Sequence, residues 1–380
     1  MQVTFPAMRG KIGQREYFAT IISLSEIPHL FKFNDWAECT PELRAQRILN
    51  EPRVPEIAHY ILDNEDGYLF SSITASYDAS SGLKFIPSPE REDVGKIEME
   101  LEHAQFIIND GQHRCAAIAL ALRENPAVGK EKISVLLFPM EDLHRLQQMF
   151  SDLNRFAHKT SKSLNVLYDH RDTLSALTIE VSEDVDVFRD MVDKESITIP
   201  IRSPKLFTLS TLYDAHREMF GSSLDKKDSP EYKKAVQQAV DYWNELADII
   251  PDWKKVKRGE LQATQLRQEK LIAHAVVVRA LGGLAKSLME QRPDTWRQSL
   301  QSLKSVDWRK AKGDKVNPQW ERACIVAGSV VSNRQARAAT LETLKSIVGL
   351  GDSLGSSRTH ATRKKNDSPN KLTIAPGIIR

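Results

Sequence analysis

The stretch IINDGQHRCAAIALAL, residues 107–122, places a short polar segment between two apolar runs. The apolar residues before the polar segment are typical of a strand, and the alanine and leucine residues after it are strong helix formers. Asp110 is a good N-cap and Gly111 permits a tight turn at low steric cost. The stretch therefore predicts a strand, a turn and a helix.

The start of this helix is a candidate anion site. Gln112, His113 and Arg114 would occupy its first turn, where backbone N–H groups have no partner within the helix. Arg114 could bind a phosphate with two hydrogen bonds, and His113 could donate to an oxygen or move a proton. An arginine in the first turn opposes the helix dipole, so we expect a bound anion or a partner carboxylate beside it. On spacing alone, a capped turn with a surface arginine is an equal alternative.

The bulk composition indicates an ordinary globular protein. The chain has 380 residues, of which 41% are hydrophobic and 27% charged, enough for two domains or one domain with a helical extension. No apolar run is long enough to span a bilayer, and the N-terminus lacks the apolar core of a signal peptide. Cys39, Cys115 and Cys324 have neither metal-site nor disulfide spacing. We therefore expect a cytoplasmic protein with reduced thiols, no metal site and no membrane partner.

Hydrophobic periodicity changes along the chain and predicts the domain organisation. Up to about residue 165, the pattern alternates between strands and helices, and after it nearly every segment has helical periodicity. Extended segments are expected at residues 17–24, 67–76, 83–86, 97–109, 132–138 and 197–209. Early helices are expected at residues 41–63 (with a break at 50–55), 114–123 and 141–150. The prediction is an α/β (α+β) domain over 1–165, a mainly α-helical domain over 166–350 and a disordered basic tail over 351–380.

A second polar block spans residues 150–172. Asp152 and Asn154 form an acid–amide pair of the kind that holds Mg²⁺ through water or orients an arginine. Lys159 and Lys162 precede an expected helix, where their side chains could reach a phosphate. The alternative is a capped loop followed by a helix surface with charge pairs.

The net charge is only +2, so any nucleic-acid contact must come from local basic segments. The tail over 351–380 has six Lys or Arg against two Asp. The segment WKKVKR, residues 253–258, combines a tryptophan with four basic residues. Each is either a phosphate-binding segment or a solvated, solubilising one.

Three segments together resemble a known bacterial family. Residues 109–114, NDGQHR, match the DGQHR signature, and residues 46–61 and 150–172 are similar to two other blocks of that family. The chain thus resembles the DGQHR-domain family, in particular its DndB branch, over roughly residues 10–175. The later helices contain no comparably specific motif.

The resemblance implies a fold distantly similar to ParB and sulfiredoxin, in which a strand–turn–helix element binds nucleotide phosphates. It also implies a DNA-binding regulatory role in DNA phosphorothioation, the sulfur modification of the DNA backbone, in a restriction–modification context. The partners would be double-stranded DNA, other proteins of the system and a second copy of the chain. Sulfiredoxin-like chemistry places its cysteine before the His-Arg pair, where this chain has Gln112, so we expect Cys115 to be a core residue.

Three hypotheses of function follow, each with its own residues. For a DNA-binding regulator, the DNA-contacting residues would be Arg47, Arg53, Lys159, Lys162 and Arg171. For a ParB-like nucleotide hydrolase, the catalytic residues would be Asp110, His113, Arg114, Asp152 and Asn154. The phosphate or nucleotide, bound with Mg²⁺, would be held by Gly111, Gln112, His113, Arg114 and Lys162. The third hypothesis is a protein scaffold for the modification enzymes.

Overall fold

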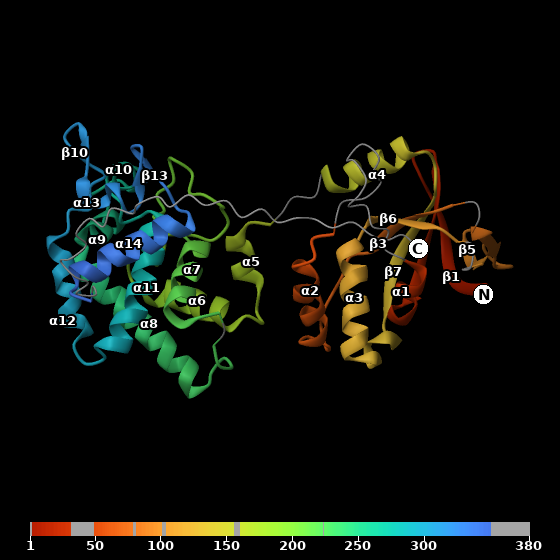
Figure 1. Cartoon of the computed structure of the whole chain (residues 1–380), viewed down its shortest axis with the longest axis horizontal. Coiled ribbons are helices and arrows are strands. Elements are labelled where there is room, and N and C mark those ends of the chain that lie inside the picture. The colour runs from red at the N-terminus through yellow and green to blue at the C-terminus, as the bar shows by residue number, and fades with distance from the viewer. Residues whose placement is uncertain are drawn as a thin grey trace, which may run out of the picture. The chain divides into compact units, whose positions relative to one another are not determined.

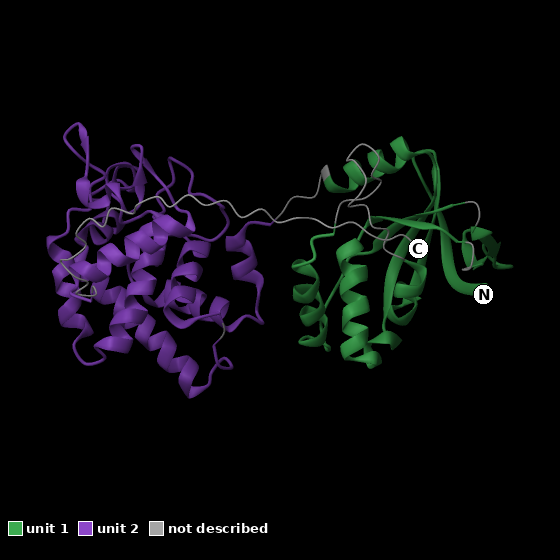
Figure 2. Ribbon diagram, in the orientation of Figure 1, with its two compact units in different colours: residues 1–158 green, residues 159–380 purple. Residues whose placement is uncertain are grey.

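The chain forms two compact units, residues 1–158 (unit 1) and residues 159–380 (unit 2) (Figure 2). The computed structural model describes residues 2–31, 49–78, 81–100, 104–155, 160–222 and 224–350. The sequence placed a domain boundary at residue 165, whereas the two units divide ahead of helix α5 (Lys162–Tyr168). The predicted tail over 351–380 and most of the helix predicted before residue 50 lie outside the described residues.

Unit 1 is built on a seven-stranded mixed sheet with the order β4-β5-β1-β2-β7-β3-β6. Its strands are β1 (Gln2–Ile12), β2 (Arg15–Ser23), β3 (Ile73–Tyr77), β4 (Lys84–Pro87), β5 (Val94–Glu100), β6 (Phe106–Asp110) and β7 (Lys132–Pro139). β3 and β7 are parallel, and the other neighbouring pairs are antiparallel. The expected mixed α/β class is confirmed.

Alternating burial explains why these segments form strands with one face on the core. In β7, Ile133, Val135 and Leu137 are buried and their neighbours are more exposed, the period-two pattern of a half-buried strand. One strand was predicted over residues 97–109, but β5 and β6 are separate strands that pair with different partners. The strand predicted from residue 67 begins only at residue 73.

The described helices of unit 1 are α1 (Ile27–Leu30), α2 (Arg53–Leu62), α3 (Gln112–Glu124) and α4 (Leu143–Arg155), with the 3₁₀ segments η1 (Leu24–Glu26) and η4 (Pro126–Lys130). Pro52 is the N-cap of α2 and Pro55 lies in its first turn, where a proline removes no helical hydrogen bond. Helix α2 therefore begins inside the predicted break over 50–55. α2 and α3 run side by side, and both contribute to the core beneath the sheet (Figure 1).

In the described part of unit 2 the regular structure is mainly helical. After α5 come α6 (Thr173–Asp184), α7 (Leu209–Phe220), α8 (Pro230–Ile249), α9 (Pro251–Lys257), α10 (Ala263–Glu269), α11 (Ala275–Gln291), α12 (Trp296–Leu300), α13 (Pro318–Glu321) and α14 (Arg334–Ile347), with the 3₁₀ segment η5 (Gln301–Ser305). Three pairs of two-residue strands accompany them, namely β8 (Val192–Asp193) with β9 (Phe207–Thr208), β10 (Ala311–Lys312) with β11 (Lys315–Val316), and β12 (Ile325–Val326) with β13 (Ser329–Val330). Of the segment expected to be extended over 197–209, only Phe207–Thr208 is a strand; residues 197–206 form bends, a turn and irregular backbone, and α7 begins at Leu209.

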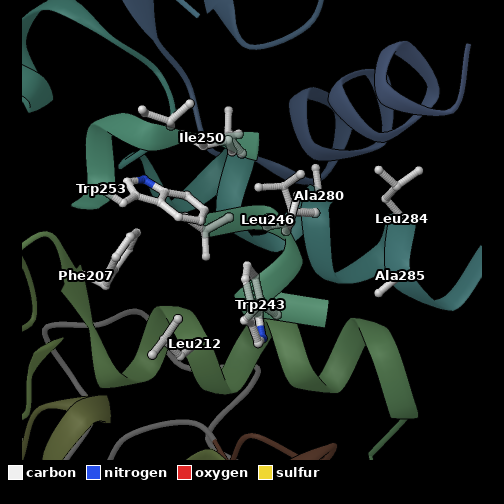
Figure 3. Packing of buried hydrophobic residues seen from close by; sticks show 14 of the residues in the cluster. Phe207, Leu212, Trp243, Leu246, Ile250, Trp253, Ala280, Leu284 and Ala285 are labelled. Atoms are coloured by element: carbon white, nitrogen blue, oxygen red, sulfur yellow. The ribbon is translucent and has the colours of Figure 1, made fainter. Parts of the chain in front are cut away.

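The core of unit 2 is rich in aromatic side chains (Figure 3). Trp243 and Trp253 are fully buried, and the Phe207 ring makes an edge contact with Trp253 at a centroid distance of 5.4 Å. α7 and α11 approach so closely that a Cβ atom on Gly282 would lie 2.1 Å from the carbonyl oxygen of Ala215. Only glycine fits at this position without moving a helix backbone.

A candidate ligand pocket at the start of α3

The strand–turn–helix element predicted from residues 107–122 is present, as β6 followed by α3. Gly111 joins them with φ +105°, a backbone conformation that L side chains rarely adopt. A Cβ atom on Gly111 would also lie 3.2 Å from atoms of both Arg114 and Ile73. The turn therefore requires glycine for conformational and steric reasons together.

Arg114 is bound within unit 1 rather than directed to solvent. Its Nη2 donates to Asp110 Oδ2 at 2.6 Å, and its Nη1 donates to Ser71 Oγ at 2.8 Å, to Ser72 O at 3.0 Å and to Ser71 O. Its side chain is only 13% exposed. We expected either a bound anion or a partner carboxylate beside an arginine in this turn. The partner carboxylate is that of Asp110.

The expected N-cap role of Asp110 is wrong. Gly111 occupies the N-cap position and no side chain caps α3, because the Asp110 carboxylate accepts from Arg114. The N–H groups of the first turn are therefore not satisfied by a capping side chain. They remain candidate donors to an anion.

His113 connects α3 to the segment before α2. Its Nε2 accepts a hydrogen bond from the backbone N–H of Asn50 at 2.9 Å. An accepting Nε2 requires that any proton on a neutral imidazole be on Nδ1. His113 therefore helps to position α2 beside the turn.

A pocket of about 520 Å³ opens at the start of α3 and lies entirely within unit 1. One part of its lining is polar, and another is formed by aromatic and aliphatic side chains. The lining residues are Arg53, Glu56, Ile57, Tyr60, Phe70, Ile108, Asn109, Asp110, Gly111, Gln112, His113, Arg114, Phe150 and Asn154. We call this the α3 pocket. It brings the turn together with residues of the two other blocks that carry the family resemblance.

Asp152 and Asn154, the predicted acid–amide pair, both lie in α4 but on different faces of the helix. Phe150 and Asn154 line the α3 pocket, and Asn154 Nδ2 donates to Phe150 O at 2.8 Å. Asp152 does not line it, and its Oδ1 accepts from Gln148 Nε2 at 2.7 Å. Residues four apart share a helix face and residues two apart do not, so Asp152 points away from Asn154.

Asn109 has a role in the pocket that the sequence did not assign. It is buried, and its Oδ1 accepts from Ser76 Oγ at 2.8 Å. Its Nδ2 is also buried and has no acceptor in the part of the chain that the structure describes. A buried unpaired donor is unfavourable, so this amide favours a ligand or water with an acceptor atom in the α3 pocket. The sequence signal that could have identified Asn109 is a polar residue within an otherwise apolar strand.

The predicted DNA-contacting residues have separate surroundings. Arg53 is exposed at the α3 pocket, whereas Arg47 and Lys159 lie outside the described residues. Lys162 and Arg171 belong to unit 2. Lys162 Nζ pairs with Asp214 Oδ1 at 2.5 Å, and Arg171 is exposed in the turn before α6.

The WKKVKR segment forms most of α9 and its end. Trp253 is fully buried and cannot stack on a base. Three of its basic residues pair with carboxylates, Lys254 with Asp248, Lys257 with Asp186 and Arg258 with Glu260. The solvated helix end therefore describes this segment better than a phosphate-binding one.

Cys115 is buried in the core of unit 1, as expected. Burial raises the pKa of its thiol to about 12, so the reactive thiolate is scarce near neutral pH. Among the described residues, no cluster of three or more His, Cys, Asp or Glu is arranged to hold a metal ion. Nor does any described helix combine the length and apolar character needed to cross a membrane.

Comparison with protein families identifies a relationship across most of the chain. The DndB family, described as DNA-sulfur modification-associated, matches residues 5–351. The chain belongs to the DndB family. The match extends through both units and includes the helices of unit 2, where the sequence offered no specific motif. Comparisons with curated proteins and with solved structures gave no match. DndB membership therefore associates the chain with DNA sulfur modification, and the expected ParB-like fold stays a prediction.

Proposed function

We propose that this DndB-family protein is a cytoplasmic, DNA-binding regulatory component of a DNA sulfur modification system. The family match over residues 5–351 carries the proposal, because it associates the whole of both described units with that modification. A net charge of only +2 argues that double-stranded DNA is contacted by local groups and not by a broadly basic face.

Titration against duplex DNA tests this role. The full chain would be titrated against labelled DNA from upstream of its own operon and against random duplex of equal length, at several salt concentrations. We expect specific binding at least about 10³-fold tighter than binding to random duplex. Equal affinity for both duplexes at physiological salt would contradict a regulatory role.

The α3 pocket supports a second function, the binding of a nucleotide. Tyr60, Phe70 and Phe150 line the pocket with aromatic rings against which a base could pack, and the N–H groups of the first turn of α3 are candidate donors to a phosphate. Arg53 adds a cation that has no ion pair among the described residues. The unpaired Asn109 amide is the observation that favours an occupant with acceptor atoms.

We favour nucleotide binding over hydrolysis in this pocket. Arg114 is occupied by Asp110 and the two serines, which leaves it no evident role on a developing charge. Asp152, predicted as one of the catalytic residues of the hydrolase, lies outside the lining. A bound nucleotide would instead act as a switch on DNA binding.

Calorimetry of the full chain with each nucleoside triphosphate, with and without Mg²⁺, tests this second function. We expect heat with at least one nucleotide and a weaker Kd for Arg53→Gln. Arg123→Gln, an exposed change at the other end of α3, is the matched control and should bind as the native chain does. Absence of heat with every nucleotide would remove this function and leave the DNA-binding role untouched. Release of phosphate in the same mixtures would support the hydrolase hypothesis instead.

The scaffold hypothesis has a distinct outcome. Pull-down of other proteins of the modification system, in nuclease-treated extract and with the purified chain, would favour it if capture persists without DNA. We expect capture to depend on DNA if the protein acts as the regulator proposed here.

A further inference from the structure

A cluster of basic side chains in unit 2 contains none of the site residues predicted from the sequence except Lys162. It gathers where α7, α11 and α14 pack against one another, with α5 beside α7. Asp214 on α7 forms ion pairs with three basic residues: Lys162 Nζ at 2.5 Å, Arg217 Nη2 at 3.1 Å and Arg279 Nη1 at 3.1 Å. Lys162 and Arg217 therefore share a single carboxylate with Arg279, which also lies 3.9 Å from Glu218.

A small pocket opens on this cluster and has an excess of positive charge. Its volume is about 260 Å³, and its lining residues are Glu218, Arg279, Ala280, Gly283, Arg334, Arg337, Ala338 and Leu341. We call it the arginine pocket. It presents three arginines and one glutamate, and Glu218 is already shared by Arg337 at 3.2 Å and Arg279 at 3.9 Å. Small side chains on α11 and α14 leave its interior open.

Two of the arginines have buried donors without acceptors. The Nε atoms of Arg279 and Arg337 are buried and have no hydrogen-bond partner among the described residues. Burial lowers the pKa of Arg279, and the positive charge of Arg337 acts in the same direction, although Asp214 and Glu218 oppose both. Glu218 is the one carboxylate of the pocket lining and already joins these two guanidinium groups, so a further anion would offset the positive charge that remains on the three arginines.

The start of α14 adds to the excess of positive charge at the arginine pocket. Arg334 and Arg337 lie in its first turn, at the positive end of the helix dipole, where basic side chains are disfavoured. Arg334 is exposed and has no ion pair in the parts of the chain that the structure describes. An oxyanion in the arginine pocket would offset both the helix dipole and the excess guanidinium charge.

We propose that the arginine pocket binds a phosphate group of the DNA backbone. The assignment rests on the DNA-binding role proposed above, and it places in unit 2 a local contact that a nearly neutral chain needs. A tetrahedral oxyanion with several acceptor oxygens is the ligand that adjacent guanidinium groups bind best. The contact fixes position on the duplex and reads no sequence.

The salt dependence of DNA binding tests the assignment. Arg334→Gln removes an exposed charge that has no ion pair among the described residues, so it should leave the fold intact. Arg337→Gln removes the charge of the neighbouring half-buried arginine, which pairs with Glu218. Arg322→Gln, at an exposed arginine of unit 2 outside the pocket lining, is the matched control. Circular dichroism and thermal unfolding would establish that all variants are folded.

For both Arg334→Gln and Arg337→Gln, we expect about tenfold weaker binding at low salt. The slope of log K against log salt should fall by about one unit, for specific and random duplex alike. The control should keep the native affinity and slope. If the native chain binds DNA and Arg334→Gln binds with the same affinity and slope, the arginine pocket is not a contact and only this assignment is overturned.

A titration with inorganic phosphate distinguishes a site for free phosphate from a site for a phosphate group of the DNA backbone. Stabilisation of the native chain by inorganic phosphate that is lost in Arg334→Gln, with DNA affinity unchanged, would identify a site for free phosphate and overturn the DNA assignment. Failure of the native chain to bind any duplex would overturn the proposed function together with this contact. Loss of DNA affinity in Arg334→Gln but not in Arg322→Gln supports the assignment.

Discussion

The Arg114 side chain shows how a residue typical of phosphate binding can be used to hold a turn. Its guanidinium joins Asp110 at the end of β6 to Ser71 and Ser72 ahead of β3, segments about forty residues apart in the chain. Arg114→Lys would keep the charge but could not reach all of these acceptors at once. We expect unit 1 to lose about 2–3 kcal/mol of unfolding free energy, measured by chemical denaturation.

Arg123→Lys, on the exposed end of the same helix, is the control for that change and should cost less than about 0.5 kcal/mol. An Arg114→Lys protein that is as stable as the native chain but no longer binds a ligand would contradict the structural role.

Gly111 allows a second test at a single residue. Gly111→Ala would force alanine into φ +105° and bring its Cβ to 3.2 Å from Ile73 and Arg114. Gly13 in the β1–β2 hairpin also has positive φ, +58°, but a Cβ there would meet nothing within 4 Å. Gly13→Ala should therefore cost about 1 kcal/mol, and Gly111→Ala clearly more, by denaturant unfolding. Equal costs would mean that the turn relaxes around the added methyl group.

At the scale of elements, a buried hydrogen-bonded chain links α6, α7 and α8. His216 Nε2 accepts from Trp243 Nε1 at 3.0 Å, so its Nδ1 carries the proton and donates to Thr178 Oγ1 at 2.9 Å. The hydroxyl of Thr178 donates in turn to Leu174 O at 2.8 Å. The side-chain donors and acceptors of Trp243, His216 and Thr178 are therefore all hydrogen-bonded while His216 is neutral.

Burial lowers the pKa of His216 from 6.5 to about 3. Between these two values the unfolded chain binds a proton that the folded chain does not, so the unfolding free energy falls as the pH is lowered. The contribution is at most about 1.4 kcal/mol per pH unit. Tryptophan fluorescence would follow it, because five of the six tryptophans lie in unit 2.

His216→Gln keeps a donor and an acceptor but does not titrate, so we expect a shallower decline between pH 6.5 and 4.5. His170→Gln, at an exposed histidine of unit 2, should decline as the native chain does. Parallel curves for all three proteins would show that His216 does not remain neutral in the folded state.

Two adjacent glycines of α11 isolate the contact between helices. Gly282→Ala would place a Cβ 2.1 Å from the backbone carbonyl of Ala215, which only a shift of α7 could relieve. Gly283→Ala would meet a side-chain carbon of Leu341 at 3.0 Å, which can rotate away. Both gain about 1 kcal/mol of helix propensity, so thermal unfolding should show a large loss for Gly282→Ala and little change for Gly283→Ala. Comparable melting temperatures would contradict the close backbone approach.

Local residue types predicted several elements, and the predictions failed where strand pairing or long-range contacts decide. The strand before Gly111, α3 and β7 were predicted from apolar runs and strong helix formers, whereas the division of residues 97–109 into β5 and β6 depends on which strands they pair with. Asp152 and Asn154 were not separated because the predicted helix ended at residue 150, whereas α4 continues to Arg155. The partner of Arg114 could not be found in this way, because Ser71 and Ser72 are distant in the chain and belong to no predicted motif.

At the scale of the whole molecule, two hydrophobic cores are distinct. One contains residues of unit 1 only, from Phe5 to Leu137, and the other residues of unit 2 only, from Val166 to Val348. A domain with its own core folds independently when few buried contacts cross its boundary. We therefore expect residues 1–158 and residues 159–380, expressed separately, each to unfold cooperatively.

The two fragments also separate the proposed activities, because the α3 pocket belongs to the first and the arginine pocket to the second. We expect nucleotide binding to be retained by residues 1–158. Residues 159–380 should bind duplex DNA weakly and without sequence preference, with a salt slope that Arg334→Gln lowers by about one unit. Circular dichroism, calorimetry and DNA titration of each fragment would measure these outcomes. A non-cooperative fragment would mean that its core needs the other unit, whereas a folded second fragment indifferent to Arg334→Gln would count against phosphate binding by the arginine pocket.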